Sequence, residues 1–186
     1  MGKIKYLLTT LLLLLLIGKS NAYQSCIEEA SRLYGINPII VYAIIKTESG
    51  FNPKAINKNK NGSYDLGLMQ INSSWLPTLS KYGYSTNHLF DPCINIKVGT
   101  WILANCIHTY GYNWKAIDCY NKGKKATGRS EYVWQVYRHM VKMVYGSQNP
   151  NIVKTSCEIE KKNSNLVINK KEDGKVKHIQ ATYDNE

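Results

Sequence analysis

The sequence of 186 residues is short of acidic side chains: 13 Asp and Glu stand against 24 Lys and Arg, which gives a formal net charge of +11. The imbalance persists over residues 23–146, where 14 basic residues accompany seven carboxylates. A surface of this charge favours an anionic partner, which can be a cell wall with peptide carboxylates, a membrane surface or a nucleic acid. Because carboxylates are so few, each one can be weighed individually as a catalytic group.

Long apolar segments are also lacking after the first 22 residues. The block Leu11–Ile17 follows a basic beginning and precedes Ser20-Asn21-Ala22, a typical small-residue cleavage site. This block is short for a membrane span of about 20 residues, which disfavours a retained anchor. We therefore expect residues 1–22 to be a signal peptide, the mature chain to reach the periplasm, and nucleic acid to be excluded as a partner.

The cysteines lack the spacing of a metal site. Cys26, Cys93, Cys106, Cys119 and Cys157 contain no C-x-x-C pair, and no histidine cluster accompanies them. Neither a metal nor a cofactor is therefore expected. In an exported chain these residues indicate at least one disulfide, and an odd number leaves one cysteine over or paired between chains.

The composition divides the exported chain in two. Residues 23–146 suit a single domain with its own core, which we expect to be monomeric. Residues 147–186 hold seven Lys, six acidic residues, several Asn and few large apolar residues, and are predicted to form a flexible polar tail.

Capping residues predict where helices begin and end. Asn37 is a good N-cap and Pro38 suits the first helical position, so a helix is expected to start here and to stop at Gly50. Asn61-Gly62 predicts a short polar hairpin. Similar signals predict a mainly helical domain with further helices over 26–34, 92–110, 114–121 and 131–145, a helical turn over 75–83 and a polar loop over 84–89.

Glu48 stands out among the carboxylates because it lies near the end of the helix that begins at Pro38. The residues three, four and seven positions earlier are Ile45, Ile44 and Val41, so the carboxylate shares its face with aliphatic side chains. Apolar surroundings and the negative end of the helix dipole both raise a carboxyl pKa. A carboxylic acid that stays protonated near neutral pH can protonate a leaving-group oxygen, as cleavage of a glycosidic bond requires. The alternative is a solvated residue at a frayed helix end.

Asp65 is the candidate for a second carboxylate opposite Glu48. It follows the predicted hairpin turn, 17 residues after Glu48, whereas the other carboxylates of 23–146 lie near predicted helices. Retaining glycosidases use such a group to stabilise or attack the sugar cation. Asp beside Gly and Ser is, however, more often a turn residue bonded to its own backbone.

Three blocks resemble the signatures of the lysozyme-like lytic transglycosylases, which cleave peptidoglycan. They are Glu48-Ser49, the block from Gly67 to Asn72, and Tyr120-Asn121 with Gly123, and they occur in the family's order. The likeness covers about 25–145 and is greatest to the small enzymes that accompany type III secretion, type IV pilus and conjugation systems. It implies a lysozyme-like helical domain with a groove for a glycan strand.

The resemblance also implies roles for individual residues. Met69 and Gln70 would line the groove, Ser49 would form a hydrogen bond there, Tyr120 would lie near the catalytic glutamate, and Asn121 would contact sugar. A disulfide between Cys26 and Cys93 is implied as well. Read without the family, Met69 is expected in the core and Ser49 as a local cap.

The implied reaction needs one carboxylate and no metal. Glu48 protonates the oxygen between N-acetylmuramic acid and N-acetylglucosamine, and then takes a proton from the C6 hydroxyl to close a 1,6-anhydro ring. Two alternatives remain open. One is a hydrolytic lysozyme that uses Glu48 and Asp65, and the other is a non-catalytic peptidoglycan-binding assembly factor of a secretion, pilus or conjugation machine.

The third block departs from the family pattern at two positions. Cys119 and Lys122 replace the alanines that flank Tyr120-Asn121, so a local disulfide and a cation near the groove are both possible. The basic stretch 122–129 suits an anionic stem peptide, although such a stretch is more often a solvated turn. Trp101 and Trp114 fall at helical spacing and are expected in the core rather than as platforms for sugars.

Overall fold

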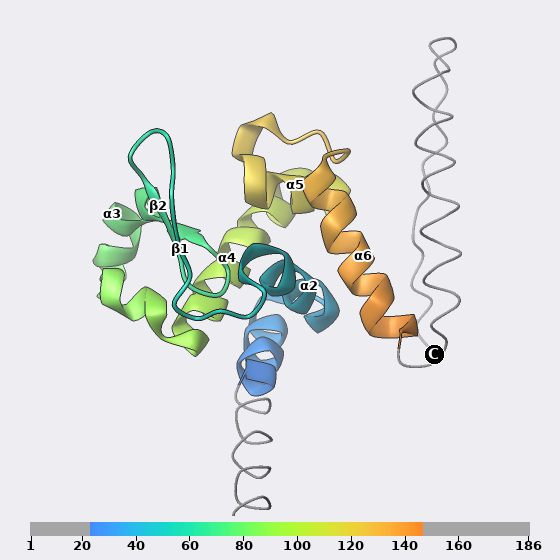
Figure 1. Cartoon of the computed structure of the whole chain (residues 1–186), viewed down its shortest axis with the longest axis horizontal. Coiled ribbons are helices and arrows are strands. Elements are labelled where there is room, and N and C mark those ends of the chain that lie inside the picture. The colour runs from blue at the N-terminus through green and yellow to red at the C-terminus, as the bar shows by residue number, and fades with distance from the viewer. Residues whose placement is uncertain (1–22, 147–186) are drawn as a thin grey trace, which may run out of the picture. The chain divides into compact units, whose positions relative to one another are not determined.

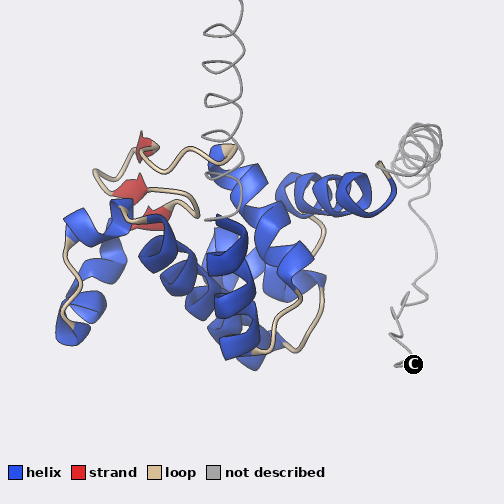
Figure 2. Ribbon diagram, turned by 90° about the horizontal axis from the view of Figure 1, so that it is seen from below, coloured by secondary structure: helices blue, strands red, loops and turns tan. Residues whose placement is uncertain are grey.

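The computed structural model describes residues 23–146. The predicted signal peptide, 1–22, and the predicted tail, 147–186 with Cys157, lie outside the described residues. Those described residues that precede Tyr145 belong to one compact unit. The domain is mainly helical, as predicted, and its strands gather at one side (Figure 2). None of its helices within 23–146 is long and apolar enough to cross a membrane.

The helix that carries Glu48 lies at the centre of the domain. Residues 23–34 form the preceding helix, and α2 then runs over Pro38–Ser49. Both ends of α2 match the prediction: the Asn37 side chain accepts a hydrogen bond of 2.9 Å from the backbone N–H of Ile39, and Gly50 ends the helix in the left-handed conformation. The core side chains of α2 are Ile40, Val41, Ala43, Ile44 and Ile45.

The hairpin predicted at Asn61-Gly62 is part of a small antiparallel sheet. Strands β1, Ile56–Lys58, and β2, Tyr64–Leu66, pair across the turn, and a third strand that the sequence did not predict, β3, Ile71–Asn72, adds to β2. The sheet order is β1-β2-β3. Its register places Asp65 opposite Asn72, so that both side chains occupy neighbouring positions on the sheet.

Short helices connect the sheet to the longest helix. They are η1, Ser73–Trp75; α3, Leu76–Leu79; η2, Ser80–Tyr82; and η3, Thr86–Phe90. The prediction of a polar loop over 84–89 was wrong, because η3 forms there as a 3₁₀ helix whose start is capped by Ser85 and His88. These two residues exchange side-chain and backbone hydrogen bonds, a capping signal that composition alone does not show.

Three helices complete the domain: α4, Pro92–Tyr110; α5, Trp114–Lys122; and α6, Glu131–Tyr145. A single turn, η4, Gly123–Lys125, follows α5. In Figure 1, α4 passes between the sheet and α3 on one side and α5 and α6 on the other.

Two disulfides join these elements. The first pairs Cys26 with Cys93, as the resemblance implied, and ties the N-terminal helix to the start of α4. The second pairs Cys106 of α4 with Cys119 of α5, which settles a pairing that the sequence left open.

Candidate active site

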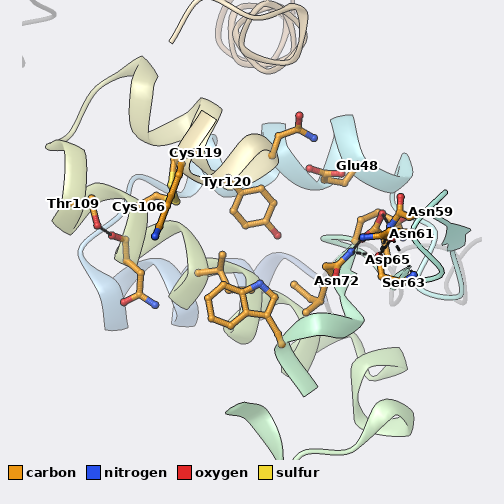
Figure 3. Close-up of a pocket in the computed structure, with 18 of the residues that line it drawn as sticks. Glu48, Asn59, Asn61, Ser63, Asp65, Asn72, Cys106, Thr109, Cys119 and Tyr120 are labelled. Carbon is orange, nitrogen blue, oxygen red and sulfur yellow. Dashed lines mark hydrogen bonds between the residues drawn. A yellow bond between two sulfur atoms is a disulfide. The ribbon is translucent and has the colours of Figure 1, made fainter. Parts of the chain in front are cut away.

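A cleft of about 880 Å³ runs between the sheet and the α4–α5 pair, and Glu48 lines it. Asp65, Gln70, Tyr120 and Asn121 line the same cleft, so the fold brings these predicted site residues together. Figure 3 shows Glu48 and the Asp65 group on one side of Tyr120, and the Cys106–Cys119 disulfide on the other. Further polar residues of the lining, which the sequence did not single out, are Asn59, Asn61, Ser63, Asn72, Asn105 and Thr109.

Glu48 sits in the last turn of α2, where it has one strong polar contact. The hydroxyl of Tyr132, on α6, donates a hydrogen bond of 2.7 Å to its Oε1 atom. Below it, Ile44 and Ile45 are fully buried. The Glu48 carboxyl group therefore has the buried Ile44 and Ile45 on its helix face and the Tyr132 hydroxyl as its hydrogen-bond donor.

These surroundings raise the pKa of Glu48 from 4.5 to about 7. Burial is the largest cause, because it removes water from the charged form. The hydrogen bond from Tyr132 lowers the pKa, and the negative charge of Asp65 raises it. The apolar neighbours of the helix face were predicted from the sequence, whereas the contributions of Tyr132 and Asp65 depend on the tertiary structure.

Asp65 is held in place by amide side chains rather than by its own backbone. Its Oδ2 atom accepts a hydrogen bond of 2.9 Å from Asn59, and its Oδ1 atom accepts one of 2.7 Å from Asn72. Ser63 contacts both of these asparagines. The network orients the carboxylate while leaving it on the lining of the cleft.

The block from Gly67 to Asn72 is anchored to α4 by a buried asparagine. Asn95, which is fully buried, accepts a hydrogen bond of 2.7 Å from the N–H of Met69 and donates to the carbonyls of Leu66 and Leu89. A Cβ atom at Gly67 would collide with Asn95, so glycine is required for this close approach. No pattern in the sequence predicted the role of Asn95.

Two residues of the motifs do not line the cleft. The side chain of Met69 is fully buried against Gly99, because it points into the core, so its expected place in the groove was wrong. The Ser49 hydroxyl donates a hydrogen bond of 2.7 Å to the carbonyl of Leu68 and is absent from the lining. Both residues fix the Gly67–Asn72 loop beside Glu48.

Gln70 is the residue of this loop that faces the cleft. Its backbone adopts a left-handed conformation with a φ of 48°, which is uncommon for a residue with a Cβ atom. Its side chain accepts a hydrogen bond of 2.6 Å from Asn57 and donates one of 2.8 Å to the carbonyl of Gly67. These bonds compensate for the backbone strain and fix the amide in the cleft wall.

Tyr120, on α5, lines the cleft. Its hydroxyl donates a hydrogen bond of 2.7 Å to the carbonyl of Met69, and burial, with the nearby charges of Glu48 and Asp65, raises its pKa well above the ordinary value. Tyr132 is likewise kept protonated, first by burial and then by the charge of Glu48. Both tyrosines therefore act as neutral hydrogen-bond donors.

Trp101 and Trp114 were both expected in the core, and the expectation was wrong for Trp114. Trp114 is 39% exposed and its ring packs edge-on against Tyr137, so it is not a core residue. Trp101 packs against the core, as expected, and its edge contacts Trp75. Trp75 lines the cleft, although the sequence offered no reason to choose it over the others.

Comparisons with known proteins agree with this geometry. The model of the transglycosylase SLT domain matches residues 25–133. The chain belongs to the transglycosylase SLT domain family. It is an enzyme of the peptidoglycan lytic transglycosylase class, and the match ends just after Tyr132, so that it includes both tyrosines.

Two similar relatives of this transglycosylase are proteins of Salmonella and Shigella. Invasion protein IagB of Salmonella typhimurium strain SL1344 is 38% identical over 144 residues, which cover 74% of this chain and 90% of the relative. Protein IpgF of Shigella flexneri is 35% identical over 130 residues, which cover 68% and 86%.

A solved structure shares the fold of this transglycosylase. It is an inactive mutant of the lytic transglycosylase Slt from Pseudomonas aeruginosa, with a TM-score of 0.53 and 23% identity. The likeness covers 67% of this chain and 24% of the Slt chain. At this identity the comparison bears on the fold, which is the lysozyme-like arrangement that the resemblance implied.

Proposed function

We propose that Glu48 is the acid and then the base of a lytic cleavage between N-acetylmuramic acid and N-acetylglucosamine in peptidoglycan. The observation that carries the proposal is the half-buried Glu48 carboxyl, whose pKa is raised to about 7, on the lining of a long polar cleft. At neutral pH such a group exists in both protonation states. It can therefore give a proton in one step and take one in the next.

The reaction begins with proton transfer from Glu48 to the glycosidic oxygen. The bond between C1 of the muramic sugar and this oxygen breaks, the N-acetylglucosamine side leaves as an alcohol, and positive charge builds on the muramic ring. The Glu48 carboxylate then takes the proton of the C6 hydroxyl of the same sugar. The C6 oxygen of the muramic sugar then bonds to C1, which closes the 1,6-anhydro ring. Glu48 is left protonated for the next cycle.

Other residues of the cleft support this cycle. The Asp65 side chain is oriented by Asn59 and Asn72 on the lining of the cleft, where a carboxylate can stabilise the sugar cation. Gln70 and Asn121 offer amide groups to the hydroxyls and acetamido groups of the glycan. Tyr120 and Ser49 hold the Gly67–Asn72 loop, and through it the distance between the two walls.

The products of the reaction test the proposal. Purified peptidoglycan is incubated with the chain from Tyr23 to Glu186 or with its Glu48→Gln variant, and the released muropeptides are analysed by mass spectrometry. We expect 1,6-anhydro ends from the first protein, and a loss of about a thousand-fold or more with the variant. Circular dichroism of the variant controls for folding.

Other products would point to the alternatives. Reducing ends that disappear with Glu48→Gln would identify a hydrolytic lysozyme in which Asp65 has an essential role. Unchanged release by Glu48→Gln would contradict the assignment of the acid. Binding without cleavage by either protein would favour a peptidoglycan-binding assembly factor.

We further propose that the enzyme works in the periplasm, after cleavage of residues 1–22, to open the wall for a secretion, pilus or conjugation machine. The motifs that resemble the small enzymes of such systems support this setting, and one relative is named an invasion protein. Deletion of the gene should reduce assembly of the machine. The wild-type gene should restore assembly and a Glu48→Gln allele should not.

A further inference from the structure

Two lysines line the cleft on opposite walls. Lys60 lies on the hairpin side, and Lys124 lies in η4 after α5. Within residues 23–146, the ion pairs are those of Lys122 with Asp118 and of Arg138 with Glu131, so neither cleft lysine is neutralised by a carboxylate of the described chain. Both ammonium groups therefore remain available to a bound ligand.

The backbone that carries Lys60 is fixed. Lys60 occupies the turn between β1 and β2, which is closed by a hydrogen bond of 3.0 Å from the N–H of Gly62 to the carbonyl of Asn59. The side chain of Asn59 also bonds to Ser63 and to Asp65. The hairpin that orients Asp65 thus also presents Lys60.

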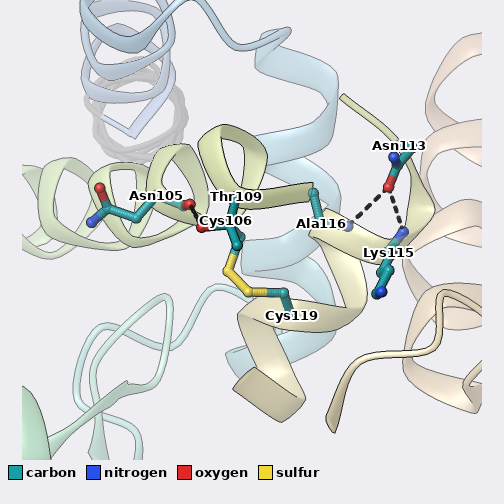
Figure 4. Close-up of a disulfide and its surroundings, with 7 residues drawn as sticks. All are labelled: Asn105, Cys106, Thr109, Asn113, Lys115, Ala116 and Cys119. Atoms are coloured by element: carbon teal, nitrogen blue, oxygen red, sulfur yellow. Dashed lines mark hydrogen bonds between the residues drawn. A yellow bond between two sulfur atoms is a disulfide. The ribbon is translucent and has the colours of Figure 1, made fainter. Parts of the chain in front are cut away.

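The backbone that carries Lys124 is fixed from both sides. Before it, Cys119 is joined to α4 by the disulfide (Figure 4). After it, the buried Asp118 accepts hydrogen bonds of 2.7 and 2.9 Å from the N–H groups of Thr127 and Gly128. Lys124 is therefore presented at a defined position on the cleft wall.

The neighbouring basic residues are directed elsewhere. Lys122 lies 3.8 Å from Asp118, so the cation that the sequence placed near the groove belongs to a structural ion pair. Lys125 and Lys58 are exposed and absent from the lining. Lys124 is therefore the one cation of the basic stretch 122–129 that faces the cleft.

We propose that Lys60 and Lys124 bind carboxylates of the glycan strand, and that the enzyme consequently prefers strands with anionic muramic residues over neutral strands. The proposal rests on the proposed function for the identity of the strand. In peptidoglycan each muramic sugar bears a lactyl ether. Its carboxyl either continues into a peptide with carboxylates of its own or is free, and N-acetylglucosamine has no such group.

The charges of the cleft agree with an anionic ligand. When Glu48 is protonated, the charged groups of the lining are Asp65, Lys60 and Lys124, so positive charge is in excess. An excess of positive charge in a cleft attracts an anionic ligand and orients it. The muramic carboxylates would then fix which sugar faces Glu48.

Binding of three strands tests the proposal. Peptide-bearing strands, strands freed of peptide by an amidase, and chitin oligosaccharides without carboxylates are titrated into Glu48→Gln protein, which leaves them uncut. Lys60→Gln and Lys124→Gln are added to this background, and Lys125→Gln and Lys58→Gln serve as matched controls. Each cleft variant should weaken binding of carboxylate-bearing strands about two- to five-fold at low salt, and binding of chitin oligosaccharides should stay unchanged.

The strands distinguish the source of the carboxylate. Weaker binding confined to peptide-bearing strands assigns the peptide, and weaker binding that extends to peptide-free strands assigns the lactyl carboxyl. Equal effects of cleft and control lysines, or an equal loss on chitin oligosaccharides, would overturn the proposal. Since binding is measured without cleavage, a wild-type protein that releases no anhydro ends would refute the proposed function alone.

Discussion

At the scale of single residues, two neighbours act on the pKa of Glu48 in opposite directions. Burial has the largest effect and raises the pKa. Tyr132 opposes it by donating a hydrogen bond to the carboxylate, and Asp65 reinforces it by charge repulsion. The pKa of about 7 is thus a balance that single substitutions can move either way.

This balance predicts opposite changes in the pH profile. Tyr132→Phe removes a bond that favours the carboxylate, so the alkaline limb of kcat/KM should move to higher pH by about half a unit to one unit. Asp65→Asn removes a negative charge, so the limb should move to lower pH by a similar amount. Rates on purified peptidoglycan between pH 5 and 9 would measure both.

Two substitutions at residues outside the cleft lining serve as controls. Tyr82→Phe removes the hydroxyl of a tyrosine that is 71% exposed, and Glu29→Gln removes an exposed carboxylate. Neither should move the profile. Shifts of the same sign for Tyr132→Phe and Asp65→Asn would mean that the two residues act through packing rather than on the charge of Glu48.

The residues of the site differ in how far the sequence could predict them. Glu48 was predicted because its apolar neighbours recur at helical spacing within a single element and because Glu48-Ser49 resembles a family signature. Tyr132 was missed because it lies 84 residues away from Glu48, and only the tertiary fold brings the two together. Met69 was expected in the core from the residue pattern, and the structure agrees with this interpretation rather than with the role implied by resemblance.

At the scale of elements, the disulfide between Cys106 and Cys119 forms part of the cleft wall. Both cysteines line the cleft, and Cys119 immediately precedes Tyr120. The bond fixes α5 against α4 near the point where Tyr120 contacts the carbonyl of Met69. The disulfide therefore supports the position of Tyr120, whose hydroxyl links the third sequence block to the second.

Removal of this disulfide should reduce activity as well as stability. A Cys106→Ser, Cys119→Ser variant should lose about 3 kcal/mol of stability, because the unfolded chain is no longer closed into a loop. Its kcat/KM should fall about ten-fold at a temperature where it stays folded, because Tyr120 and Asn121 lose their fixed position. Urea titrations and assays at that temperature measure the two effects.

The other disulfide provides a matched control. Cys26 and Cys93 are 67 residues apart and do not line the cleft. A Cys26→Ser, Cys93→Ser variant should lose about 4 kcal/mol and keep its kcat/KM where it is folded. Equal losses of kcat/KM in the two variants would show that the first disulfide acts on activity through stability alone.

The elements themselves were predictable where local signals define their ends. Asn37, Asp91 and Asn113 each cap the helix that the sequence predicted there. The strand at Ile71–Asn72 was missed because two residues carry no periodicity and its pairing depends on β2. The role of Asn95 was hidden because its bonds to Met69 and Leu66 join residues that lie 26 and 29 positions away in the sequence.

At the scale of the whole molecule, two carboxylates make stability depend on pH in opposite directions. Burial alone would raise the pKa of Asp118, but hydrogen bonds from Ser130, Thr127 and Gly128 and the charge of Lys122 outweigh it, and the pKa is lowered. Asp118 therefore stabilises the fold above its ordinary pKa of 3.8, and this contribution is lost as the pH falls. Glu48, with its raised pKa, stabilises the fold when protonated.

The contribution of Glu48 is complete below pH 4.5, its ordinary pKa, and is lost as the pH rises to about 7. Glu48→Gln should therefore stabilise the domain at pH 8, by up to about 3 kcal/mol, and change its stability little at pH 4. Urea titrations at the two pH values, with Glu29→Gln as the control, measure the difference. An equal effect of Glu48→Gln at both pH values would show that the residue acts through packing. A gain confined to alkaline pH would mean that the Glu48 carboxylate, which proton transfer requires, destabilises the fold. It would do so in the same pH range in which Glu48 ceases to act as an acid.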